Sequence, residues 1–173
     1  MALTAQATKQ GPAYKGGGLI LVASLGILAT VFAYEHLGGY APCPLCLQQR
    51  YAFYAAVPLC FAALFALSMD ASRLATLILL AVAFIFLANV ALAGYHAGIE
   101  WGYWPGPASC GSAQTLDFNA KTLVQSMQQT NVIRCNEAAG RFLGLSFAGW
   151  NVIASFILFV IGLKSANAAA KEH

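Results

Sequence analysis

Four long stretches without a charged side chain constrain this 173-residue chain more than any other feature of its sequence. They run from Gly16 to Tyr34, from Tyr51 to Met69, from Leu74 to Ile99 and from Phe142 to Leu163. A helix needs roughly 20 consecutive apolar residues to cross the hydrocarbon core of a bilayer, which is about 30 Å thick. Each stretch reaches that length, so the sequence predicts four membrane-spanning helices.

The small share of charged residues excludes an ordinary water-soluble domain. Charged residues make up 9% of the chain, against roughly 25% in a typical globular protein, too few to cover a water-exposed surface. We therefore predict an all-α integral membrane protein. It is a four-helix transmembrane bundle forming one domain over residues 1–173, with spans at about 17–36, 50–69, 74–96 and 145–163. The first apolar stretch exceeds the roughly 7–15 residues of a secretory signal, and we interpret it as a retained span.

Four spans place both termini on one side of the membrane and the loops at about 37–49 and 97–144 on the other. Lys and Arg concentrate on the cytoplasmic side of membrane proteins. The termini and the short turn between the second and third spans carry the denser basic residues, namely Lys9, Lys15, Arg73, Lys164 and Lys171. This bias predicts cytoplasmic termini. The chain has no basic run or Arg-rich helix, so we expect no nucleic-acid partner.

A short amphipathic helix is predicted within the second of these loops. Its apolar residues recur at helical spacing with polar residues between them: Leu116, Ala120, Leu123, Val124 and Met127. Such a helix either lies on the membrane surface or caps the ends of the bundle, and the pattern does not distinguish the two. In both cases it would hold the loop close to the bilayer.

Four of the five cysteines fall in these two loops. Cys60 lies midway along the second apolar stretch, where a thiol acts as a small hydrophobe. Cys43 and Cys46 precede the second span, and Cys110 and Cys135 lie in the long loop. With cytoplasmic termini, all four would face an oxidising compartment in which disulfides form and persist.

Cys43-Pro44-Leu45-Cys46 has the spacing of a redox pair. Thiols in a Cys-x-x-Cys sequence often have a lowered pKa, a helix start favours an anion, and Arg50 follows Cys46 by one helical turn. A structural disulfide and half of a metal site are the alternatives. Four-cysteine zinc sites usually contain two closely spaced pairs, whereas Cys110 and Cys135 are far apart, so we assign no metal.

A second pair of cysteines on the same membrane face permits an electron relay by disulfide exchange. Cys110 and Cys135 could also form a purely structural bridge. A relay needs a non-protein acceptor at its end, and a membrane quinone suits an apolar bundle. Arg50 is a candidate to steady a thiolate and the quinone oxygen, or an interfacial residue that extends to lipid phosphates. His96 is a candidate quinone ligand or an ordinary interfacial histidine.

Several segments together resemble the DsbB family of disulfide bond formation proteins over roughly residues 18–163. They are Pro42 to Arg50 (PCPLCLQQR), Tyr95 to Gly102 (YHAGIEWG), Pro105 to Pro107 (PGP) and Phe142 to Leu145 (FLGL). Some members of that family have an acidic residue before the arginine, where this chain has Gln49. From the residues alone, Gln49 and Glu35 look like ordinary helix-end residues.

The resemblance implies a bacterial inner-membrane enzyme with its redox loops in the periplasm. It would reoxidise a periplasmic DsbA-like protein of the thioredoxin fold and pass two electrons to ubiquinone or menaquinone. By position, Cys110 would form the mixed disulfide with the partner and Cys135 would exchange with Cys43. Cys46 would be the thiolate facing the quinone, with Arg50 as its electrostatic support.

Two rival hypotheses have distinct signatures. A quinone-linked oxidoreductase of the vitamin K epoxide reductase type would have its Cys-x-x-Cys late in the chain, whereas here it precedes the second span. A non-enzymatic four-span scaffold would use two inert disulfides to staple its loop. Four cysteines also allow three pairings, and the resting connectivity is left open.

Overall fold

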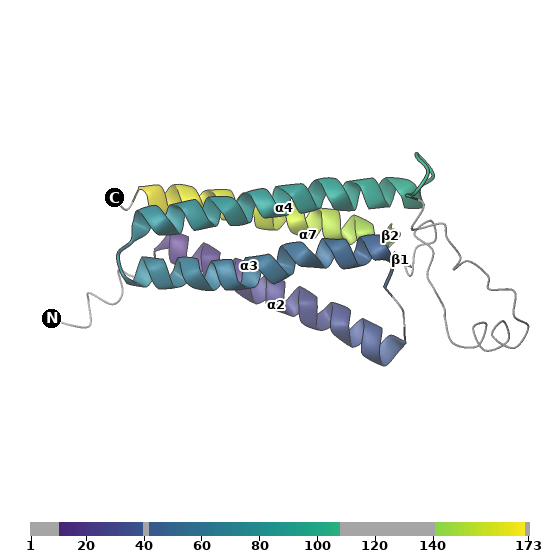
Figure 1. Cartoon of the computed structure of the whole chain (residues 1–173), viewed down its shortest axis with the longest axis horizontal. Coiled ribbons are helices and arrows are strands. Elements are labelled where there is room, and N and C mark those ends of the chain that lie inside the picture. Colours follow the sequence, from purple (N-terminus) through teal and green to yellow (C-terminus); the bar gives the residue numbers. More distant parts are fainter. Residues whose placement is uncertain (1–10, 40–41, 108–140, 172–173) are drawn as a thin grey trace, which may run out of the picture.

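The computed structural model of the chain describes residues 11–39, 42–107 and 141–171. Four long helices make up most of this part: α2 (Pro12–Gly38), α3 (Pro44–Ser68), α4 (Ser72–Glu100) and α7 (Phe147–Ala170). Each is long and apolar enough to cross a membrane. They pack lengthwise into one bundle, in which α2 begins and α7 ends at the same end (Figure 1). The predicted four-helix bundle is confirmed.

The third helix continues past the expected end of its span. The sequence placed that end near residue 96, but α4 remains helical to Glu100, and the N–H of Trp101 still bonds to the carbonyl of Ala97 at 3.0 Å. The chain turns only at Gly102, whose φ of 75° is costly for a residue with a side chain. His96 therefore lies within the helix, one turn before its end.

A short hairpin precedes α7 where the sequence predicted the start of the fourth span. Strands β1 (Arg141–Phe142) and β2 (Leu145–Ser146) pair antiparallel. They are joined by Leu143 and Gly144, whose φ values are 53° and 83°. Two positive φ values in a two-residue loop define the turn that matches the twist of paired strands. Ser146 then caps α7, because its hydroxyl accepts the N–H of Gly149 at 3.2 Å.

Small residues allow the helices to approach closely. A Cβ added to Gly162 of α7 would lie 3.1 Å from Cβ of Ala83 on α4, and one added to Gly16 of α2 would collide with the hydroxyl of Ser165. Small residues at helix contacts are typical of membrane bundles, in which packing takes the place of the hydrophobic effect. Phe61, Phe65, Leu77, Phe84 and Phe156 point outward and are exposed, as lipid-facing side chains would be.

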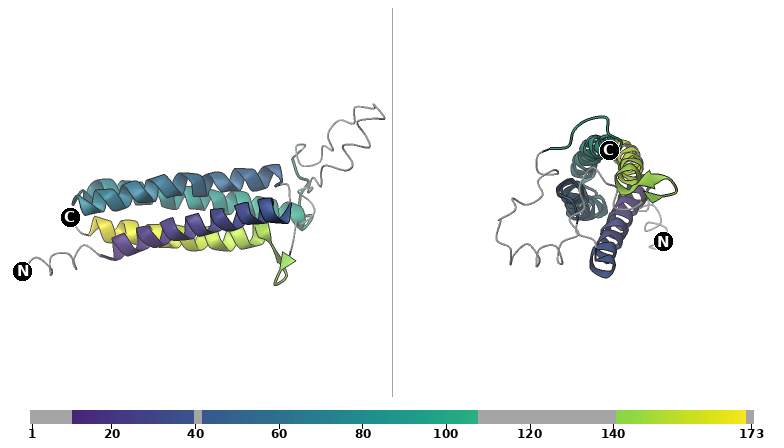
Figure 2. Two further views of the ribbon diagram at one scale, coloured as in Figure 1. Left: turned by 90° about the horizontal axis from the view of Figure 1, so that it is seen from below. Right: turned by 90° about the vertical axis from the view of Figure 1, so that its right-hand side faces the viewer.

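The C-terminal end of α2 diverges from the other three helices (Figures 1 and 2). It ends at Gly39, which adopts the left-handed conformation and returns its N–H to the carbonyl of Glu35. Cys43 and α3 begin shortly afterwards, at the same end of the bundle. The predicted amphipathic helix, Cys110 and Cys135 lie outside the described residues.

Candidate functional site: a disulfide on a buried histidine

Cys43 and Cys46 form a disulfide at the head of α3. Cys43 is the N-cap residue, with an extended backbone, and Pro44 begins the helix. Proline is favoured at this position because its missing N–H would have no helical partner and its φ is already suitable. The Cα atoms of the pair are 5.1 Å apart, within the usual range for a disulfide.

The two sulfur atoms have different surroundings. Sγ of Cys43 accepts the backbone N–H of Cys46 at 3.1 Å, and Cys43 is only 2% exposed, whereas Cys46 is half-buried. Leu45 and Ile99 pack around Cys43 in a small apolar cluster. Cys46 is thus the more accessible half of the bond.

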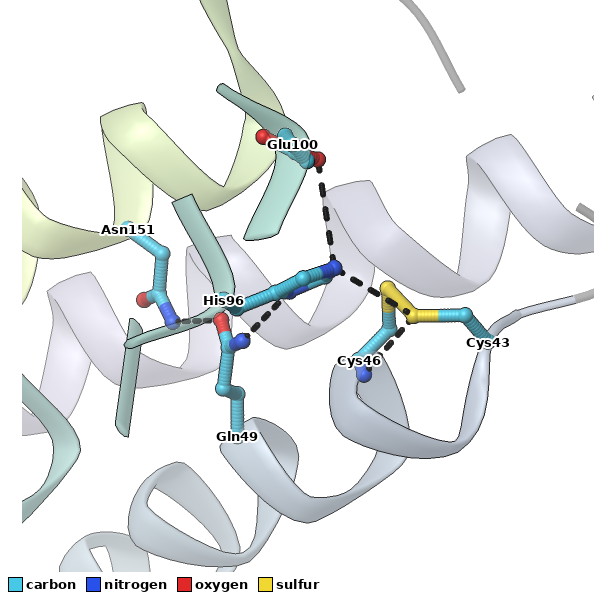
Figure 3. Close-up of a disulfide and its surroundings, with 6 residues drawn as sticks. All are labelled: Cys43, Cys46, Gln49, His96, Glu100 and Asn151. Atoms are coloured by element: carbon cyan, nitrogen blue, oxygen red, sulfur yellow. Dashed lines mark hydrogen bonds and ion pairs between the residues drawn. A yellow bond between two sulfur atoms is a disulfide. The ribbon is translucent and has the colours of Figure 1, made fainter. Parts of the chain in front are cut away.

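His96 brings an imidazole to the inner sulfur. Its Nε2 lies 3.8 Å from Sγ of Cys43, and the residue is 3% exposed. Glu100, one turn further along α4, places a carboxylate oxygen 3.9 Å from the same nitrogen. Figure 3 shows the Nε2 edge of the ring turned towards both the disulfide and Glu100.

A chain of polar side chains continues from the other ring nitrogen. Nε2 of Gln49 lies 2.8 Å from Nδ1 of His96, and Nδ2 of Asn151 donates to Oε1 of Gln49 at 2.6 Å (Figure 3). Deeper in the bundle, Ser155 donates to Oδ1 of Asn151 at 3.2 Å, and Asn89 donates to the Ser155 hydroxyl at 2.9 Å. This chain connects α3, α4 and α7. Polar groups inside a membrane bundle are expensive unless they are paired.

Arg50 is bound by a carboxylate from α2. Its Nη1 donates to Oε2 of Glu35 at 2.7 Å, and its guanidinium lies 5.6 Å from the centre of the Phe32 ring. The arginine is buried, so it does not extend freely into the lipid headgroups. Glu35, interpreted from the sequence as an ordinary helix-end residue, is its ion-pair partner.

The ligand atoms of Cys43, Cys46 and His96 lie within 4.8 Å of one another, close enough in principle for a metal ion. Metals bind the thiolate form of cysteine, and both sulfur atoms here are joined to each other. The arrangement therefore favours disulfide chemistry over coordination. Cys60, by contrast, is a free thiol buried in the core beside Phe53 and Phe86, as expected of a small hydrophobe.

Sequence reasoning missed most of the residues that support His96. Gln49 was interpreted as a helix-end residue, and Asn89, Asn151 and Ser155 received no role. A signal was nevertheless present, since a polar side chain within a membrane-spanning stretch marks a functional or packing site. The sequence did not show which of these side chains meet.

The bundle and its disulfide define a class of protein: a multi-pass membrane protein with a disulfide at the N-terminal end of its second spanning helix. The family model described as "Disulfide bond formation protein DsbB" matches residues 16–164. The chain belongs to this family, which confirms the resemblance seen in its cysteine segments. Membership also decides against the vitamin K epoxide reductase type.

Relatives share the match over most of their length. A protein of Marinobacter nauticus named "Disulfide bond formation protein B" is 30% identical over 151 residues, covering 84% of this chain and 87% of that protein. A protein of the same name from Herminiimonas arsenicoxydans is 31% identical over 153 residues, covering 85% and 90%. A third, from Aromatoleum aromaticum, is 29% identical over 150 residues, covering 84% and 87%.

Proposed function

We propose that this protein is a quinone-dependent thiol oxidoreductase that reoxidises a periplasmic DsbA-like protein of the thioredoxin fold. The partner's dithiol loses two electrons and two protons and becomes a disulfide, while ubiquinone or menaquinone gains them and becomes a quinol. The observation that carries the proposal is the disulfide of Cys43 and Cys46 at the rim of a four-span bundle, with one half-buried sulfur and one buried sulfur.

The electrons reach this disulfide by thiol exchange. A partner thiolate attacks Cys110 of a Cys110–Cys135 disulfide, forming a mixed disulfide and releasing the Cys135 thiolate. Cys135 attacks Sγ of Cys43, and the electron pair of the broken Cys43–Cys46 bond remains on Cys46. Cys46 is the suitable leaving sulfur because it is the more accessible of the two and lies in the first turn of α3, whose N-terminus favours an anion.

The surface beside Cys46 suits a flat apolar acceptor from the lipid. Leu47, Tyr51 and Tyr54 are exposed on the first turns of α3, and the rings of Tyr51 and Tyr54 are 6.4 Å apart between centres. Arg50 belongs to the same turns but is buried and paired with Glu35, and its guanidinium is the proposed electrostatic support of the acceptor. When bound, the quinone supplies the two-electron acceptor that disulfide exchange alone lacks, and Arg50 is its predicted polar contact. His96, the other quinone ligand predicted from the sequence, directs Nδ1 at Gln49 and Nε2 at Cys43, so it acts on the disulfide beside the quinone.

The proposed location is the bacterial inner membrane, with both termini in the cytoplasm and both redox loops in the periplasm. This orientation rests on the basic residues near the termini. It brings the disulfide to the compartment in which secreted proteins acquire their disulfides.

Purified protein in lipid nanodiscs tests the enzymatic proposal. With a reduced thioredoxin-fold dithiol protein and a soluble ubiquinone analogue, we expect quinone reduction, followed by its ultraviolet absorbance. Cys46→Ala should abolish turnover, because no sulfur remains to carry electrons from Cys43 to the quinone. Cys60→Ala is the matched control and should retain turnover, since Cys60 lies in the core.

A stapled scaffold predicts a different result. It would show no quinone reduction by the wild-type protein, and Cys46→Ala would lower only its stability. Either failure of turnover in the wild type or full turnover in Cys46→Ala would contradict the proposal.

A further inference from the structure

We infer that His96 stabilises the thiolate of Cys43 through its Nε2–H, and that Gln49 and Asn151 are positioning residues which hold the imidazole in that tautomer. The inference rests on the proposed function and extends it, because it concerns the inner sulfur of the redox pair. It is carried by hydrogen-bond directions that run from α7 to the disulfide.

The orientation of the Gln49 amide group determines the direction of its hydrogen bond with His96. Its Oε1 accepts the N–H of Asn151 at 2.6 Å, so its amide nitrogen is the atom that faces Nδ1 of His96 at 2.8 Å. An amide NH₂ group donates hydrogen bonds and does not accept them. Nδ1 must therefore be the acceptor, and a neutral imidazole then carries its proton on Nε2.

Hydrogen bonds deeper in the bundle fix the orientation of the Asn151 amide group, and through it that of Gln49. Ser155 receives the N–H of Asn89 and donates its own hydrogen to Oδ1 of Asn151. This leaves the Asn151 amide nitrogen directed at Gln49. Asn89 and Ser155 are buried. Reversing the direction of a single hydrogen bond in this chain would place two donors or two acceptors against each other, so all the bonds would have to reverse together.

The surroundings of Nε2 agree with a proton on that atom. Its two neighbours are Sγ of Cys43 at 3.8 Å and a carboxylate oxygen of Glu100 at 3.9 Å, and both are acceptors. Among the residues that the structure describes at this end of the bundle, Arg50 and Glu35 are engaged with each other. The Nε2 side of the ring thus agrees with the tautomer that Gln49 sets at Nδ1.

The sulfur of Cys43 consequently has two donors, the N–H of Cys46 at 3.1 Å and the Nε2–H of His96. They matter when the Cys43–Cys135 disulfide of the relay is resolved. The partner's second thiolate first attacks the partner sulfur of the mixed disulfide, which forms the partner disulfide and releases the Cys110 thiolate. That thiolate attacks Cys135, a Cys110–Cys135 bond forms, and the electron pair of the broken Cys43–Cys135 bond passes to Cys43. No net oxidation occurs, and the proton stays on Nε2. Donors aimed at a sulfur that becomes charged make it a better leaving group.

The tautomer is directly measurable. In the oxidised full-length protein with ¹⁵N-labelled histidine, long-range ¹H–¹⁵N correlation spectra distinguish a protonated from an unprotonated ring nitrogen. The signals of His96 are separated from those of His36 and His173 by their loss in His96→Asn. We expect the Nε2–H form in the wild type. Gln49→Glu should protonate Nδ1, because a carboxylate only accepts.

A second measurement follows the sulfur itself. The fully reduced protein is alkylated with iodoacetamide at a series of pH values, and the Cys43 peptide is quantified by mass spectrometry. Gln49→Met keeps the side-chain length but releases the imidazole. It should move the midpoint of the Cys43 profile to higher pH and lower the thiolate fraction below that midpoint by about tenfold. The neighbouring exposed Gln48, changed to Met, is the matched control and should leave the profile unchanged.

These results separate the inference from the proposed function. An Nδ1–H tautomer in the wild type, or an unchanged Cys43 profile in Gln49→Met, overturns the positioning role even if the enzyme reduces quinone. Conversely, a wild-type protein that fails to reduce quinone contradicts the proposed function, whatever the tautomer. Asn151→Leu, which removes the donor to Gln49, gives a second variant should Gln49→Met fail to fold.

Discussion

Arg50 and Glu35 form a pair whose two members differ in burial. The arginine side chain is 10% exposed and the carboxylate 26%. Removal of one partner from a buried pair leaves the other charge uncompensated, and partial exposure of Glu35 reduces this cost. The pair also joins the diverging end of α2 to the head of α3, beside the redox disulfide.

Glu35→Gln is therefore expected to lower the stability of the oxidised protein by about 1–2 kcal/mol. Thermal unfolding in detergent, followed by circular dichroism, measures the loss. Lys15→Gln neutralises an exposed charge at the other end of α2 and should change the unfolding temperature little. Equal effects of the two substitutions would mean that the ion pair contributes nothing specific.

At the scale of the helices, the approach of α4 to α7 brings the site together. His96 lies on α4 and Asn151 on α7, and Gln49 of α3 bonds to both. Further along, Gly162 packs against Ala83 with no room for a larger side chain. Glycine at position 162 lets α4 and α7 approach closely. The same two helices carry His96 and Asn151, so a close approach of α4 and α7 is also what the polar chain requires.

Gly162→Val should force α4 and α7 apart and cost roughly 1–3 kcal/mol, the usual range for overpacking. Unfolding in detergent tests this expectation. Gly26→Val is the matched control, because a Cβ added at Gly26 meets nothing within 4 Å. If both variants were equally stable, the close approach of the two helices would not be a constraint.

The helices themselves were predictable from the sequence, because length and apolarity alone identify a membrane span. The rotation of each helix about its own axis was not predictable. Each helix is apolar around its whole circumference, so no stripe shows which side faces its neighbours. The pairing of Gln49 with His96 and Asn151 depends on those rotations. The Cys-x-x-Cys pair was predictable because it is local in sequence.

For the whole molecule, the four-span bundle fixes which segments share a membrane face. The disulfide lies at the start of α3, and that end of α3 is opposite the turn that joins α3 to α4 (Figure 1). The proposed orientation puts that turn in the cytoplasm and the cysteine pair outside. The side of the turn and the side of the cysteine pair follow from the same topology, so an error in one would be an error in the other.

Labelling of intact spheroplasts with a membrane-impermeant maleimide tests the orientation. After mild reduction, Cys46 and Cys110 should both react from outside. A cysteine introduced by Ala71→Cys, in the turn between α3 and α4, should react only after the membrane is permeabilised. Labelling of Cys46 and Cys110 from opposite sides would exclude the electron relay.

The run of directed hydrogen bonds from Asn89 to His96 has a consequence for how such sequences diverge. A change at one link leaves a donor against a donor, or an acceptor against an acceptor, in a largely buried part of the bundle. Descendants of a common ancestor should therefore exchange these positions in concert. A survey that scores each alignment column separately would undervalue them, whereas one that follows pairs of columns should detect them as a unit.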